Sequence, residues 1–176
     1  MSQPIATVIL APLRATYANH HDIIAMAAHV TLSHRLVLPS DANHYGTLYA
    51  GSLLRIALEA AYVAAYRTVG QQANLVLRRV LSLECYKPVP VGALVEIRGV
   101  TLHLTRTYQV IGLIGSRLDE QSEPWMDALM GFVQVNGEGH VAEFPDNLEA
   151  ASPGEEWNAL RQRMEKLLRL RIRPGE

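Results

Sequence analysis

The chain contains very little cysteine: Cys85 is the only one among 176 residues. A single cysteine excludes a disulfide within the chain, and it excludes a zinc site built from four cysteines. Proteins without disulfides are typical of reducing compartments, so we expect a cytoplasmic location. Cys85 itself is expected to be a small residue of the core.

The sequence also lacks an excess of positive or negative charge. Sixteen Lys and Arg residues nearly balance 17 Asp and Glu residues, which leaves a formal net charge of -1. A chain with this balance has no bulk attraction to phosphate, so we expect no nucleic-acid partner.

Long uncharged apolar runs are also missing from the sequence. The longest candidate contains Arg55 and Glu59, so it falls short of the roughly 20 apolar residues that a membrane-spanning helix needs. The apolar residues 5–10 follow no positive charge and are soon interrupted by Pro12 and Arg14. We therefore expect neither a secretion signal nor a membrane partner.

The histidines do not form a metal-binding pattern. His20, His21, His29 and His34 are close in sequence, but no carboxylate joins them at a regular ligand spacing. Such histidines usually lie in strands or loops, so we expect no bound metal ion.

The sequence does contain enough apolar residues for one core, since 49% of the chain is hydrophobic. A chain of this length buries roughly two-thirds of its unfolded surface when it folds. We therefore expect a single domain over residues 1–176.

Apolar patterns and turn-forming residues divide the chain into strands and helices. A loop rich in turn formers, residues 40–46, precedes a long helix, and four strand-like runs with short connections follow that helix. Consecutive strands of this kind predict an antiparallel meander. The expected strands are 29–39, 74–87, 93–104, 106–116 and 125–136, and the expected helices are 51–69 and 153–172.

The helix expected at residues 51–69 has apolar residues on nearly every side, and only Arg55, Glu59 and Arg67 are charged. Such a helix has to be surrounded by protein. The simplest arrangement wraps the sheet around the helix, which gives an α+β fold. A curled sheet still has open edges that a two-fold related copy can close, so we expect a homodimer at least.

The helix expected at residues 153–172 is acidic at its start and basic at its end. Trp157, Leu160, Met164, Leu167 and Leu168 recur at helical spacing. We interpret this segment as a helix that docks on the domain and keeps its basic face in solvent. A surface for phosphate or for a partner is the alternative.

Four short motifs occur in order: PSDANHYGTLYAG at 39–51, KPVPVG at 87–92, RT at 106–107 and ALMGFVQVNGEGHVAEF at 128–144. Together they resemble the acyl-CoA thioesterases of the hot-dog fold, both the small bacterial and the brain-type acyl-CoA hydrolases, over a core of about residues 29–145. The resemblance implies hydrolysis of an acyl-CoA thioester to free acid and CoA. It implies no cofactor besides the CoA of the substrate, and a homo-oligomer that is a dimer or a hexamer.

The resemblance also implies a site shared between two subunits. One subunit supplies a loop asparagine, which is Asn43 here, and the other supplies an acidic residue of the central helix. That acidic position, seven residues after Gly51, is occupied by Leu58, and Glu59 follows it. Glu59 is therefore either the catalytic acid or the structural partner of Arg55, which lies four residues earlier on the helix.

The remaining candidates lie mainly around the same loop. The backbone N–H groups at Ala50 and Gly51, where the helix begins, are expected to stabilise the oxyanion, with Ala50 in place of a family glycine. Asn43 serves either the reaction or turn formation. The candidate substrate-binding residues are Asp41, His44, Gly46 and Arg106, of which Asp41 has loop ordering as its alternative role and Arg106 suits a CoA phosphate.

Two functions therefore remain open. The first is an acyl-CoA thioesterase. The second is a catalytically silent hot-dog protein that binds acyl-CoA or another apolar ligand, and Leu58 at the acidic position is the feature that favours it.

Overall fold

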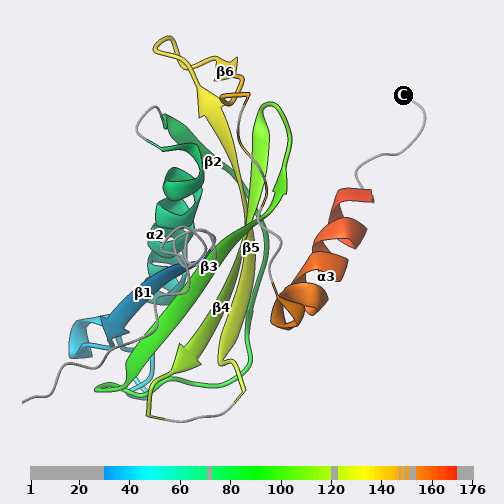
Figure 1. The fold of residues 1–176 in the computed structure, drawn as a ribbon. Coiled ribbons are helices and arrows are strands. Elements are labelled where there is room, and N and C mark those ends of the chain that lie inside the picture. The colour runs from blue at the N-terminus through cyan, green and yellow to red at the C-terminus, as the bar shows by residue number, and fades with distance from the viewer. Residues whose placement is uncertain are drawn as a thin grey trace, which may run out of the picture.

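The computed structural model describes residues 30–70, 73–119, 123–146, 148, 150 and 154–169. His20, His21 and His29 lie outside these ranges. The elements are β1 (Thr31–Leu36), η1 (Pro39–Asp41), α2 (Ala50–Val69), β2 (Leu75–Cys85), β3 (Leu94–Leu104), β4 (Tyr108–Arg117), β5 (Met126–Val135), β6 (Val141–Ala142), η2 (Glu155–Trp157) and α3 (Asn158–Arg169) (Figure 1).

The strands form one antiparallel sheet in the order β1-β3-β4-β5-β2, and the short β6 pairs with β5. The predicted α+β architecture is confirmed. The predicted meander is right for β3, β4 and β5 but wrong for β2, which lies at the far edge beside β5. Three strand spacings, roughly 14 Å, separate β2 from β3. The proline-containing connection of residues 86–93 is long enough to cross this distance.

Helix α2 lies against one face of the sheet, and α3 lies on the other side (Figure 1). The sheet-facing side of α2 is rich in alanine, which allows close approach to the strands. A Cβ at Gly99 of β3 would already lie 3.0 Å from the Cβ of Ala64. The residues of α2 that are buried in the core are Leu53, Ile56, Ala57, Ala60, Ala61, Ala64, Ala65 and Val69.

The opposite side of α2 is not covered. Leu54, Tyr62, Val63 and Tyr66 are each at least 40% exposed, so the single chain does not provide the cover that an apolar helix requires on this side. The apolar outer face of α2 continues onto Val76 of the edge strand β2, and Val76 and Val80 of this strand are also exposed. The helix is apolar all round, yet its own sheet covers only one side of it.

The predicted docking of the C-terminal helix is confirmed. Trp157, Leu160 and Met164 are buried against apolar residues of β3, β4 and β5. Arg163 also faces the sheet, where it forms ion pairs with Glu84 and Asp127. The basic side of α3 is therefore not wholly solvated, because one arginine fixes the helix to the sheet.

Tyr86 completes this polar cluster and donates a 2.6 Å hydrogen bond to Asp127 Oδ2. Burial, together with the hydrogen bond to Asp127, raises the pKa of Tyr86 to about 12. Cys85, the last residue of β2, is exposed, so the prediction that it belongs to the core is wrong. It lies on an edge strand, where only one flanking strand is present to cover side chains.

Among the residues that the structure describes, no helix is both long and apolar enough to cross a membrane.

Candidate functional site

The candidate site begins with the loop of residues 39–49, here called the Asn43 loop, which connects β1 to α2. Asp41 closes this loop from within: its carboxylate accepts the Leu38 N–H at 3.3 Å, and its backbone carbonyl accepts the Tyr49 N–H at 2.8 Å. Only 5% of the Asp41 side chain is exposed. The structure therefore supports the predicted ordering role of Asp41.

Asn43 holds the tip of the loop through its own side chain. Its Oδ1 accepts the backbone N–H groups of Tyr45 at 2.9 Å and Thr47 at 3.2 Å, and its Nδ2 donates to Thr47 Oγ1 at 3.0 Å. This is the turn-forming arrangement that asparagine favours. The role of Asn43 in the reaction stays a prediction.

Gly46 in the Asn43 loop and Gly51 in the first turn of α2 are explained by different physical causes. Gly46 adopts φ +73°, a left-handed conformation that favours glycine. A Cβ at Gly51 would lie 2.5 Å from Cε1 of the exposed Tyr49 ring, so any other residue there requires this ring to move. Both glycines are thus explained by backbone conformation or close approach, as predicted.

The start of α2 presents backbone donors next to this loop. Tyr49, the residue before the helix, makes no side-chain hydrogen bond to the first turn, and both Ala50 and Gly51 are exposed. The first N–H groups of a helix have no acceptor within the helix, and the helix dipole favours negative charge at this end. This end of α2 can therefore stabilise a developing oxyanion.

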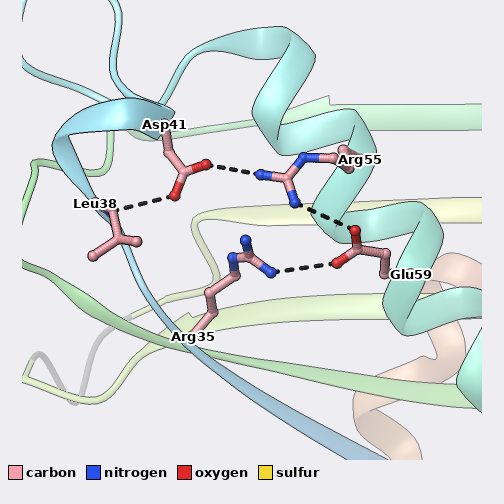
Figure 2. A network of polar contacts seen from close by, with 5 residues as sticks. All are labelled: Arg35, Leu38, Asp41, Arg55 and Glu59. Atoms are coloured by element: carbon pink, nitrogen blue, oxygen red, sulfur yellow. Dashed lines mark hydrogen bonds and ion pairs between the residues drawn. The ribbon is translucent and has the colours of Figure 1, made fainter.

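An ion-pair network connects the Asn43 loop, α2 and β1 (Figure 2). Arg55 Nη2 lies 2.8 Å from Asp41 Oδ1, and Arg55 Nη1 lies 3.3 Å from Glu59 Oε1. Arg35 of β1 reaches the other oxygen of Glu59 at 3.3 Å. The predicted pair of Arg55 and Glu59 is therefore present, and 55% of the Glu59 side chain remains exposed.

Arg35 and the link from Arg55 to Asp41 are the parts of this network that sequence reasoning missed. Alternation along β1 places Arg35 on the face turned toward α2, opposite the buried Val95. An ionisable side chain on an inward face needs a partner of opposite charge. The alternation of side chains along β1 could therefore have identified Arg35 as a member of the network from the sequence.

Leu58 lies in a groove that is almost entirely apolar. The groove has a volume of about 570 Å³ and runs between the outer face of α2 and the first residues of β2. Tyr62 and Phe132 meet edge to face inside it, with ring centroids 6.2 Å apart. The lining residues of this Leu58 groove are Leu58, Glu59, Tyr62, Val63, Leu75, Val76, Leu77 and Phe132.

Glu59 also lines a smaller hollow of about 210 Å³ beside β1, together with Arg35. Glu59 therefore lines both the hollow and the Leu58 groove. Glu59 is the charged residue of a groove otherwise suited to a hydrocarbon chain.

Two predicted substrate-binding residues differ in their surroundings. His44 is exposed at the loop tip, and its ring lies 3.8 Å from that of Tyr45. Arg106 is paired with Glu143 at 2.6 Å and follows the C-terminal end of β3, whereas the Asn43 loop contacts the segment before the N-terminal end of β3. The 11 residues of β3 span roughly 35 Å at about 3.3 Å each, so one chain does not bring Arg106 to Asn43.

Within the described part of the chain, no cluster of three or more His, Cys, Asp or Glu residues is arranged to hold a metal ion.

Comparison with known proteins identifies the fold. No protein-family model and no curated protein matches the chain. Among solved structures, an acyl-CoA hydrolase from Staphylococcus aureus in complex with butyryl-CoA, CoA and CoA disulfide matches with a TM-score of 0.70 and 21% identity, over 84% of this chain and 91% of that one.

Two further solved structures show the same fold. An acyl-CoA hydrolase from Bacillus cereus matches with a TM-score of 0.67 and 18% identity, over 84% of this chain and 87% of that one. A hexameric thioesterase from Yersinia pestis matches with a TM-score of 0.61 and 22% identity, over 66% of this chain and 97% of that one. The predicted hot-dog fold is therefore confirmed.

Proposed function

We propose that this chain hydrolyses acyl-CoA thioesters to free acid and CoA, at a site shared between two copies of the chain. The observation that carries the proposal is the position of the Asn43 loop, in which Asp41 accepts the N–H of Tyr49 directly before the exposed start of α2. The fold shared with acyl-CoA hydrolases over 84% of the chain supports it.

In the proposed reaction, the thioester carbonyl binds at the start of α2. The N–H groups around Ala50 and Gly51 stabilise the negative charge that develops on the carbonyl oxygen, and the Asn43 amide orients the substrate. Glu59 of the other subunit takes a proton from water, and the water oxygen attacks the carbonyl carbon. The carbon–sulfur bond then breaks, and the proton passes to the CoA thiolate.

We propose a homodimer as the unit that completes this site. The outer face of α2 and the edge strand β2 together expose Leu54, Tyr62, Val63, Val76 and Val80. An open strand edge beside an apolar face is a surface that a two-fold related copy can cover. Further assembly of dimers into a hexamer is also proposed, and the hexameric thioesterase from Yersinia pestis supports it.

A specific observation favours the second candidate, a silent protein that binds acyl-CoA or another apolar ligand. Leu58 lies in an apolar groove, and both carboxylate oxygens of Glu59 are engaged by arginines. For catalysis, Glu59 has to leave Arg35 and Arg55. In a silent protein Glu59 stays paired with both arginines, and the Leu58 groove holds the apolar part of the ligand.

The experiment that separates the two candidates measures release of free CoA thiol from a panel of acyl-CoAs of different chain length. Binding of the same compounds is measured by calorimetry. Turnover of at least one acyl-CoA supports the thioesterase. Binding with no thiol release above the uncatalysed rate contradicts the thioesterase and supports the silent protein.

A further inference from the structure

We infer that Arg55 is a positioning residue that holds the Asn43 loop in register with the start of α2. This inference rests on the proposed function, because it assigns Arg55 a part in the same site. Arg55 does not touch the reacting atoms in the proposed reaction; it acts through Asp41 on the loop that carries Asn43.

Asp41 ties the loop together and also links it to the helix. Its carboxylate accepts the Leu38 N–H before the loop, and its carbonyl accepts the Tyr49 N–H at the end of the loop. Its second carboxylate oxygen receives Arg55 Nη2 at 2.8 Å. The ends of the loop are therefore joined at a single residue, and Arg55 connects that residue to the second turn of α2.

The guanidinium of Arg55 is itself held in one orientation. Its Nη1 donates to Glu59 Oε1 one turn further along the helix, while Arg35 holds the other oxygen of Glu59 from β1 (Figure 2). The four charges alternate in sign from the loop to the strand. A planar guanidinium that bridges two carboxylates fixes both distance and direction, which a flexible ammonium group does less well.

The buried position of Asp41 makes this link necessary. A carboxylate that is 5% exposed needs a partner of opposite charge, and breaking such a pair leaves a buried charge uncompensated. The opposite side of the loop has separate anchors, because Leu48 N–H bonds to Val89 and Val91 N–H bonds to Gly46. Loss of Arg55 therefore leaves the loop attached to the turn at 88–92 but removes the ion pair between Asp41 and the second turn of α2.

Loss of Arg55 is expected to change the distance between Asn43 and the N–H groups at Ala50 and Gly51. Asn43 lies two residues after Asp41 and is fixed to Thr47 and Tyr45 of the same loop, so it moves when the loop moves. A displacement of about 1 Å between groups that act on one carbonyl can reduce the rate by about 100-fold. Loss of the ion pair between Arg55 and Asp41 is therefore expected to change kcat more than KM.

The test compares Arg55→Met with Arg55→Lys, using hydrolysis of the acyl-CoA that the wild type turns over fastest and hydrogen exchange of the Leu38 and Tyr49 amides. Arg55→Met is expected to lower kcat by about 10- to 100-fold, with KM changed by less than about 3-fold, and to speed exchange of both amides by at least about 10-fold. Arg55→Lys is expected to recover only part of the loss, because an ammonium still neutralises Asp41 but does not bridge Asp41 and Glu59 as the guanidinium does.

Two further arginines serve as matched controls. Arg67→Met, on the last turn of the same helix, is expected to leave kcat and exchange at wild-type values. Arg35→Met removes the other arginine of Glu59 but leaves the link from Arg55 to Asp41, so exchange of the Leu38 and Tyr49 amides is expected to stay at the wild-type rate. Faster exchange in Arg35→Met, equal to that in Arg55→Met, would overturn the inference.

Unchanged exchange in Arg55→Met also overturns the inference, and so does faster exchange with unchanged kcat. If Arg55→Met does not fold, the double variant Asp41→Asn with Arg55→Met removes the uncompensated charge. That variant is expected to fold with reduced kcat. A wild-type kcat in the double variant would contradict the inference that Arg55 positions the Asn43 loop through Asp41. If the wild type hydrolyses no acyl-CoA, the proposed function fails, while exchange in Arg55→Met still decides whether Arg55 holds the loop.

Discussion

Replacing Glu59 by glutamine separates the two roles open to this residue. The substitution preserves the shape of the side chain and removes its charge. If Glu59 is only an ion-pair partner, the change affects stability alone. If Glu59 activates water, hydrolysis is lost as well.

The structure sets the size of the effect on stability. Each oxygen of Glu59 pairs with one arginine at 3.3 Å, and 55% of the side chain is exposed. Exposed ion pairs of this kind contribute about 0.2 to 1 kcal/mol each, so the loss of both costs at most about 2 kcal/mol. An amide oxygen at position 59 still accepts from one arginine, which reduces that cost.

The effect on catalysis is larger and appears in a different measurement. Removal of a general base lowers kcat by about 100- to 10,000-fold, which corresponds to about 3 to 5 kcal/mol of transition-state free energy. We expect Glu59→Gln to lower kcat by at least about 100-fold in thiol-release assays, while the midpoint of thermal unfolding moves by only a few degrees.

Glu165→Gln provides the matched control. Glu165 also pairs with an arginine four residues away on a helix, and 51% of its side chain is exposed. It is expected to leave kcat unchanged. Wild-type hydrolysis in Glu59→Gln would refute the catalytic assignment and leave Glu59 as the structural partner of Arg35 and Arg55.

Further predictions concern the groove, the assembly, α3 and pH. Leu58→Asp is expected to raise hydrolysis in the thiol-release assay, because it restores an acid seven residues after Gly51; unchanged or lower activity would contradict the family register. Val80→Glu, on the exposed edge of β2, is expected to give monomers in light scattering, whereas the exposed Val141→Glu on β6 is expected to leave the oligomer intact. Trp157→Ala removes a fully buried side chain and should lower the free energy of unfolding in urea by about 3 to 5 kcal/mol; a loss below about 1 kcal/mol would show that α3 contributes little. Because the pKa of Tyr86 is raised to about 12, the folded chain keeps the phenol proton at pH values where the unfolded chain has lost it. That contribution to stability is complete below about pH 10 and disappears as the pH rises to about 12, and Tyr86→Phe should flatten this part of the pH–stability curve.

The sequence predicted those elements that depend on local patterns. The helix expected at 51–69 is observed as Ala50–Val69, and the expected strands correspond to β1, β2, β3, β4 and β5. The pair of Arg55 and Glu59 was predictable for the same reason, because residues four apart on a helix are neighbours.

The features that the sequence did not predict depend on contacts between distant segments. Whether β2 pairs with β3 or with β5 is decided by tertiary packing, since the pattern of each strand is compatible with either neighbour. Arg35 is 24 residues from Glu59, and no local rule connects them.

Leu58 and Glu59 show how much chemistry depends on one residue of helical register. Adjacent residues on a helix point about 100° apart. Here Leu58 lies in the apolar groove beside β2, whereas Glu59 reaches the arginines of α2 and β1. An acid at position 58 would have its carboxylate in a groove lined by Tyr62 and Phe132, where desolvation raises the pKa of a carboxyl group. Glu59 sits beside two guanidinium groups, and each of its carboxylate oxygens lies 3.3 Å from one of them. Catalysis by Glu59 therefore requires its carboxylate to leave Arg35 and Arg55 when the substrate or the second subunit arrives, whereas the separate bond from Arg55 Nη2 to Asp41 stays in place.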